Sequence, residues 1–183
     1  MEIVNMDKLS EPQLMQAALI LAEELPIGWP TLSQATDEVN KLLARDDGTV
    51  LIAAIDDGEV TGWCGILPEY NGNVYELHPL VVSRKKQRKG IGTKLVETVS
   101  EIAREKGGLT LQLGSDDEKP GGETSFANVD LYDDLPRRIK EFETETHPAA
   151  FYLKIGFKIV GVVPDANGKG KPDIMFAKPL QSL

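Results

Sequence analysis

Apolar residues near the N-terminus recur every three or four positions, which predicts two amphipathic helices. The first helix follows Ser10, which with Gln13 matches a capping box. The second is predicted from Ser33 to Ala44. The inward faces consist of Leu14, Ala17, Ala18, Leu21 and Leu25 in the first helix, and of Val39, Leu42 and Leu43 in the second.

Short apolar runs then predict the centre of a sheet. Val50–Ile55 and Val60–Ile66 flank an Asp57-Gly58 turn, a pattern typical of a hairpin. Val74–Val82 is apolar throughout its second half, which favours a central strand. A helix from Gly92 to Glu105 should follow it.

In the C-terminal part, apolar residues recur either every three or four positions, as in a helix, or in short runs and alternating positions, as in a strand. We expect strands at Leu109–Leu113, Phe157–Val163 and Ile174–Lys178, and helices at Leu135–Phe142 and Pro148–Ile155. The polar segment Ser115–Asn128 is a long loop, of the kind that is functional or mobile. Because hairpins and helices both connect neighbouring strands, the chain is predicted to be one mixed α/β domain, residues 1–183.

Composition narrows the class of function. The chain has 183 residues, a net charge of −9 and one cysteine, Cys64, so no internal disulfide is possible. We expect a cytoplasmic protein with no metal, no membrane partner and no nucleic-acid partner, since an acidic chain repels phosphate backbones and no apolar run spans a bilayer.

The segment after Val74–Val82 departs from this acidic background. It carries six basic residues and no acid, and two glycines stand where the next helix begins. Unpaired N–H groups at a helix start suit a phosphate, and glycine lets the ligand approach the backbone. The alternative to a phosphate-binding loop is a solvated basic turn whose glycines only shape the start of the helix. The residues are Arg84, Lys85, Lys86, Arg88, Lys89 and Lys94, with Gly90 and Gly92.

The order Gln87-Arg88-Lys89-Gly90-Ile91-Gly92 resembles the acetyl-coenzyme A loop of the GNAT N-acetyltransferase superfamily. Leu95 stands where a dinucleotide-binding fingerprint has its third glycine, and no Walker A sequence is present. From about Leu51 to the C-terminus, the segments YELHPLVV, LGSDDE, VDLYDD, HPAAFYLKIGFKIVGVVPDANG and KPDIMFAK resemble the aminoglycoside 6′-N-acetyltransferases, above all the chromosomal Gram-positive kind.

This resemblance implies an α/β (α+β) GNAT fold, with a mixed central sheet of about six to seven strands flanked by helices. It implies transfer of acetyl from acetyl-coenzyme A to the 6′-amine of an aminoglycoside, by direct attack in a ternary complex, in a homodimer. On the donor side, backbone N–H groups of the loop would hold the pyrophosphate, and a strand end would pair with the pantetheine arm. These residues are Gln87, Arg88, Lys89, Gly90, Ile91, Gly92 and Thr93 in the loop, and Leu80, Val81 and Val82 in the strand, with Lys154 near the phosphates.

Glu76 and His78 lie on one face of the same strand by alternation. The resemblance makes Glu76 the base, through water, or an ammonium anchor, and lets His78 orient the substrate or relay a proton. It also places the Leu80 N–H near the thioester oxygen and Tyr152 at the departing sulfur. The alternative is that Glu76 is only an exposed carboxylate, His78 a hydrogen-bonded structural imidazole and Tyr152 a tyrosine of the core.

Charge agrees with a cationic acceptor. Between Ser115 and Glu145 there are ten acids and four bases. Asp116 and Asp117 directly follow a predicted strand and are our candidates for substrate binding, with Trp29 as a wall; a solvated acidic loop is the alternative. The same fold could acetylate a polyamine, a small metabolite or a protein amine, or act as a non-catalytic acyl-coenzyme A sensor.

Overall fold

The computed structural model describes residues 1–181. Seven strands belong to one mixed sheet in the order β1-β2-β3-β4-β5-β7-β6, flanked by helices, which confirms the predicted α/β (α+β) class. The residues divide into two compact units, Met1–Leu111 with the residues from Leu180 onward, and Gln112–Pro179. The single domain expected from the sequence stays a prediction.

The first unit contains the elements up to the third long helix. Its helices and strands follow the predicted order, and β4 has the predicted bounds. The strand β1 was missed because it is only four residues long and gives no readable period. The elements are β1 Glu2–Asn5, α1 Glu11–Glu24, α2 Leu32–Leu43, β2 Val50–Asp56, β3 Glu59–Glu69, β4 Val74–Val82 and α3 Ile91–Glu105.

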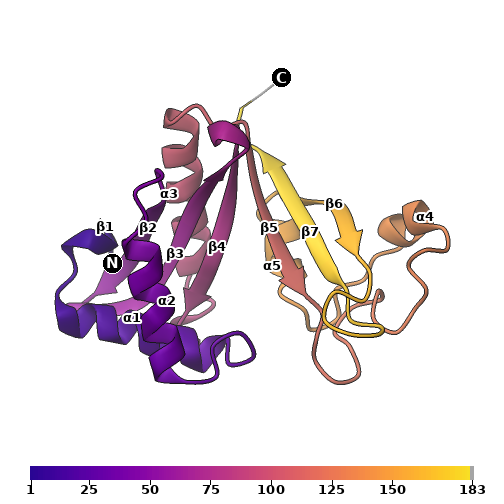
Figure 1. The fold of residues 1–183 in the computed structure, drawn as a ribbon, viewed down its shortest axis with the longest axis horizontal. Coiled ribbons are helices and arrows are strands. Elements are labelled where there is room, and N and C mark those ends of the chain that lie inside the picture. The colour runs from indigo at the N-terminus through magenta and orange to yellow at the C-terminus, as the bar shows by residue number, and fades with distance from the viewer. Residues whose placement is uncertain (182–183) are drawn as a thin grey trace. The chain divides into compact units, whose positions relative to one another are not determined.

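Helices cover both faces of this part of the sheet. The helices α1 and α2 lie on one face of β2–β4, and α3 lies on the other (Figure 1). The buried Trp63 indole fixes α1 to β3, since its Nε1 donates to the Ala17 carbonyl oxygen at 2.9 Å. The predicted capping box begins α1, where the Ser10 N–H donates to Gln13 Oε1 at 3.0 Å.

The antiparallel pairing of β3 with β4 is interrupted once. Cys64 pairs with Leu80, but the next pair is Ile66 with Leu77. Two residues of β4 therefore oppose a single glycine of β3, Gly65, which is a β-bulge. A Cβ atom on that glycine would lie 2.5 Å from the carbonyl oxygen of His78, so the strands approach too closely for any side chain there.

The bulge decides which way the side chains of β4 point. Trp63 and Val81 are paired, and both belong to the core under α1 and α2. Leu67 belongs to the same core and is paired with Glu76, so Glu76 lies on that face too. His78, two residues further, shares the face, as predicted. Simple alternation would have put His78 and Val81 on opposite faces.

The second unit contains the C-terminal strands and two short helices. The strands β6 and β7 are antiparallel, with Phe157 and Phe176 fully buried. Its first strand runs three residues past the predicted end at Leu113, so Ser115 and Asp116 belong to a strand and not to the expected loop. The elements are β5 Thr110–Asp116, whose first two residues belong to the first unit, α4 Leu135–Lys140, α5 Ala149–Lys154, β6 Lys158–Val163 and β7 Asp173–Pro179.

We predict that Gly65→Ala lowers the free energy of unfolding by about 2 kcal/mol, because the new methyl group must push the β4 backbone away at the bulge. The matched control is Gly161→Ala in β6, where the added Cβ would lie 3.8 Å from its nearest neighbour, the Met175 side chain. Urea unfolding of both variants measures the difference. Equal stabilities would show that the bulge yields without cost.

Candidate active site

The basic loop after β4 turns sharply before α3 begins. Arg88 has a φ of 62° and Gly90 a φ of 83°, both in the left-handed region. Gly90 is the N-cap of α3, and a Cβ atom there would meet nothing within 4 Å. Among residues 1–181, the N–H groups of Arg88, Lys89 and Gly90 donate to no other atom. The first N–H groups of α3 lack helical partners as well, so this corner presents several unpaired donors.

A carboxylate from α1 holds the loop in place. Glu24 Oε1 accepts from the Arg84 N–H at 2.7 Å, and Glu24 Oε2 accepts from Gln87 Nε2 at 3.3 Å. The Gln87 amide also donates to the Val82 carbonyl oxygen at 2.9 Å. The Gln87 side chain therefore shapes the loop. Nothing in the sequence indicated Glu24, because the contact joins residues 60 positions apart.

The six basic side chains of the loop are not equivalent. Lys86 Nζ lies 2.9 Å from Asp56 Oδ2. This hydrogen bond and the attraction of the charges lower the pKa of Asp56 and raise the pKa of Lys86. Arg88, Lys89 and Lys94 are exposed and form no ion pair within the described chain. Lys85 is likewise exposed and has no ion pair among residues 1–181, so four of the six cations are not neutralised by an acid of the described chain.

On β4, the predicted acceptor residues Glu76 and His78 are both half-buried. The imidazole of His78 lies beside Trp29, with ring centroids 5.8 Å apart and a tilt of 51°. Its Nε2 is 4.0 Å from Oε1 of Glu38, a residue of α2 that the sequence did not single out. The first unit thus brings Trp29, Glu76 and His78 to one face of the sheet, together with Glu38.

The end of β4 carries the other predicted donor residues. Leu80 pairs with Cys64, Val81 with Trp63, and Val82 with Gly62 across the ladder to β3. The Val81 side chain is buried, so only its backbone is left for a ligand. Cys64 is also buried, and burial raises the pKa of its thiol far above the ordinary value, which leaves no accessible thiolate.

The remaining predicted residues lie in the second unit. Tyr152 on α5 is half-buried, with its ring centroid 5.8 Å from Phe157 and 5.9 Å from Phe176. These buried rings fix the direction of the tyrosine ring. Lys154, in the last turn of α5, is exposed.

The two neighbouring aspartates have different surroundings. Asp116 is exposed, and its Oδ1 accepts from Asn167 Nδ2. Asp117 is fully buried; its Oδ1 accepts from the Glu123 N–H and its Oδ2 from Thr124 Oγ1, both at 2.7 Å. Asp117 therefore fastens the loop that follows β5. Burial and the nearby charge of Asp116 raise the pKa of Glu118 in the same segment.

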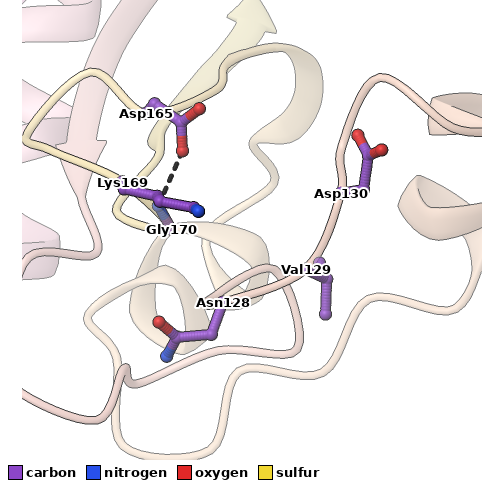
Figure 2. Close-up of a pocket in the computed structure, with 6 residues that line it drawn as sticks. All are labelled: Asn128, Val129, Asp130, Asp165, Lys169 and Gly170. Atoms are coloured by element: carbon purple, nitrogen blue, oxygen red, sulfur yellow. Dashed lines mark hydrogen bonds between the residues drawn. The ribbon is translucent and has the colours of Figure 1, made fainter.

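A cavity of about 450 Å³ lies elsewhere in the second unit. It is bordered by the segment Asn128–Asp130 and by the turn between β6 and β7, where the Gly170 N–H donates to Asp165 Oδ1 at 2.6 Å (Figure 2). None of the predicted catalytic or binding residues lines it.

Residues 1–181 contain no group of three or more His, Cys, Asp or Glu side chains arranged to hold a metal ion. Over the same residues, no helix has the length and apolar character needed to cross a membrane.

Three solved structures that are similar to this chain over its whole length are aminoglycoside 6′-acetyltransferases. An aminoglycoside 6′-N-acetyltransferase complexed with coenzyme A is 33% identical, with a TM-score of 0.92 over 100% of this chain and 99% of the other. The aminoglycoside 6′-N-acetyltransferase of Enterococcus faecium is 33% identical, with a TM-score of 0.90 over the same shares. An aminoglycoside 6′-acetyltransferase type Ii is 30% identical, with a TM-score of 0.77, again over 100% and 99%.

A search of curated proteins gave no match. The sequence profile described as "Acetyltransferase (GNAT) family" matches residues 14–120, which include β4, the basic loop and α3. With the full-length similarity to three acetyltransferases, this match shows that the chain belongs to the GNAT family of acetyltransferases.

Proposed function

We propose that this acetyltransferase moves acetyl from acetyl-coenzyme A to the 6′-amine of an aminoglycoside, by direct attack in a ternary complex. The observation that carries this proposal is the similarity along the whole chain to aminoglycoside 6′-N-acetyltransferases, one of them complexed with coenzyme A. We also propose that the enzyme acts as a homodimer in the cytoplasm.

The basic loop fits the donor. A pyrophosphate needs several hydrogen-bond donors and positive charge, and the unpaired N–H groups from Arg88 to Thr93 supply the donors. Arg88, Lys89 and Lys94 supply charge that no acid neutralises. The open space beside Gly90 lets the ligand reach the backbone. Gln87 keeps the loop in shape through its side chain, and because its backbone N–H donates to the Arg84 carbonyl oxygen at 3.4 Å, we assign it no contact with the pyrophosphate.

The acyl arm would continue along the end of β4. Leu80, Val81 and Val82 offer backbone groups to the pantetheine amides, and the Leu80 N–H donates to the thioester oxygen. A donor at that oxygen stabilises the negative charge that develops during attack. Lys154 adds positive charge near the phosphates.

The acceptor amine must be neutral when it attacks. Glu76 takes its proton through a water molecule, while His78 orients the amine. The nitrogen then bonds to the carbonyl carbon, the carbon–sulfur bond breaks, and the departing thiolate takes a proton from the Tyr152 hydroxyl. The acylated nitrogen loses its remaining extra proton, which returns through water to the tyrosinate, and Glu76 releases the first proton to solvent. The buried Phe157 and Phe176 rings hold that tyrosine in a fixed orientation for this step.

Carboxylates and an aromatic wall would bind the rest of the acceptor. Glu76 lies on the same face of the sheet as Trp29 and His78, where a flat indole can pack against a sugar ring. Asp116 is exposed and attracts a further ammonium group. The buried Asp117 keeps its role in the loop, and we assign it no direct contact with the acceptor.

The first test is acceptor-dependent release of thiol from acetyl-coenzyme A. We expect rapid release with neomycin and none with paromomycin, which carries a hydroxyl in place of the 6′-amine. Spermidine and a peptide amine complete the panel. Preference for either of those amines would reassign the substrate class, and tight coenzyme binding without any acceptor-dependent release would identify a non-catalytic sensor.

We predict that Glu76→Ala lowers kcat about 100-fold at neutral pH because the amine keeps its proton, while the Kd for acetyl-coenzyme A changes little. Steady-state kinetics and calorimetry measure the two quantities. Glu101→Ala, which changes an exposed carboxylate of α3, is the control and should leave both unchanged. If Glu76→Ala weakened coenzyme binding and turnover equally, Glu76 would be structural.

We further predict that Gly90→Val raises the Kd for acetyl-coenzyme A at least about tenfold, because the side chain fills the space that the pyrophosphate needs. Gly107 offers a close control at the other end of α3. Its φ is 91° against 83° for Gly90, and a Cβ atom at either would meet nothing within 4 Å. Gly107→Val therefore introduces the same backbone strain. Equal Kd values for the two variants in calorimetry would exclude the loop as the donor site.

A further inference from the structure

The imidazole of His78 is held from two sides within the first unit. Trp29 lies against the ring, and Glu38 on α2 faces its Nε2 atom at 4.0 Å. The Glu38 side chain is 15% exposed, whereas its other partner, Lys41, is 68% exposed. The Glu38 carboxylate is thus confined by its neighbours, whereas the exposed Lys41 side chain can adjust its position to that of Glu38.

The position of Glu38 on α2 needs an explanation. Ala35, Val39 and Leu42 form the buried stripe of this amphipathic helix, and Glu38 lies beside them, three residues after Ala35. A half-buried carboxylate loses hydration, so it persists where charged or polar partners compensate. An apolar residue would pack at this position without that loss, which suggests that Glu38 serves a purpose other than stability.

A carboxylate that faces one ring nitrogen favours the proton on that nitrogen. The charge of Glu38 therefore favours the tautomer of His78 with hydrogen on Nε2. Nδ1, on the other side of the ring, then keeps its lone pair and can accept a hydrogen bond. A histidine without such a partner distributes its proton between both nitrogens.

We propose that Glu38 is the positioning residue for His78. It holds the imidazole in its Nε2–H form, so that Nδ1 accepts a hydrogen bond from the acceptor amine and turns the amine lone pair toward the thioester. The orienting step rests on the proposed transferase function, whereas the effect of Glu38 on the imidazole is a property of the resting protein.

The resting protein gives the first test, by nitrogen NMR of the imidazoles at about pH 8, where an ordinary histidine is neutral. The chain has two histidines, and the second is an internal reference. His147 is buried, its Nε2 lies 3.0 Å from the Asp116 carbonyl oxygen, and its Nδ1 accepts from the Ala149 N–H at 3.1 Å. These contacts fix the Nε2–H form of His147.

We expect His78 to give the Nε2–H pattern in the unmodified protein and a mixture of tautomers in Glu38→Gln, which keeps the shape of the side chain. The His147 signals should not move. Lys41→Gln removes the other partner of Glu38 and should leave both histidines unchanged. If His78 gave the same nitrogen shifts in Glu38→Gln as in the unmodified protein, the proposal would be wrong.

Kinetics supply the second test. A lost orientation lowers kcat and leaves binding intact, so we expect Glu38→Gln to reduce kcat about tenfold with little change in the KM for the amine. Glu38→Asp, which keeps the charge, should restore part of the loss, and Lys41→Gln should match the unmodified enzyme. A raised KM with unchanged kcat would mean that Glu38 binds the acceptor directly. If no amine is acetylated, the transferase proposal fails, and the NMR comparison still decides the pairing.

Discussion

The close approach of β3 and β4 at Gly65 is the constraint on which the proposed acceptor site depends. One residue of β3 opposes two of β4 there, and no side chain fits between the strands. Because of this bulge, Glu76 and His78 share a face with Val81. The face under α1 and α2 thus changes from an apolar core to a polar site within a few residues of the same strand.

Much of this arrangement was readable from the sequence. The bounds of β4, the capping box of α1 and the glycine turn before α3 all depend on local patterns, and the structure confirms them. The bulge was not readable, because a glycine followed by an apolar run is also compatible with an uninterrupted ladder. The paired residues are distant in sequence, and their register is set only when the strands meet.

The roles of individual acidic side chains could not be predicted from the sequence, for a related reason. Glu24 and Glu38 are helix acids, and helix acids are usually solvated, so the sequence offered no reason to select them. Asp117 is a predicted substrate-binding residue because it directly follows a strand, yet it is fully buried with both carboxylate oxygens bonded to its own loop. Burial of a carboxylate depends on tertiary partners that periodicity does not report.

These three carboxylates change how the acidity of the chain should be understood. Glu24 fixes the start of the basic loop, Glu38 faces His78, and Asp117 fastens the segment after β5. Part of the net charge of −9 therefore holds functional segments in place and is not available to attract a cationic ligand. In the same way, Glu24 and Asp56 form ion pairs with two of the six loop cations, Arg84 and Lys86. Selectivity for the donor and the acceptor must come from the few charges that remain unpaired, because a charge already neutralised by a neighbour contributes little to the field that a ligand meets.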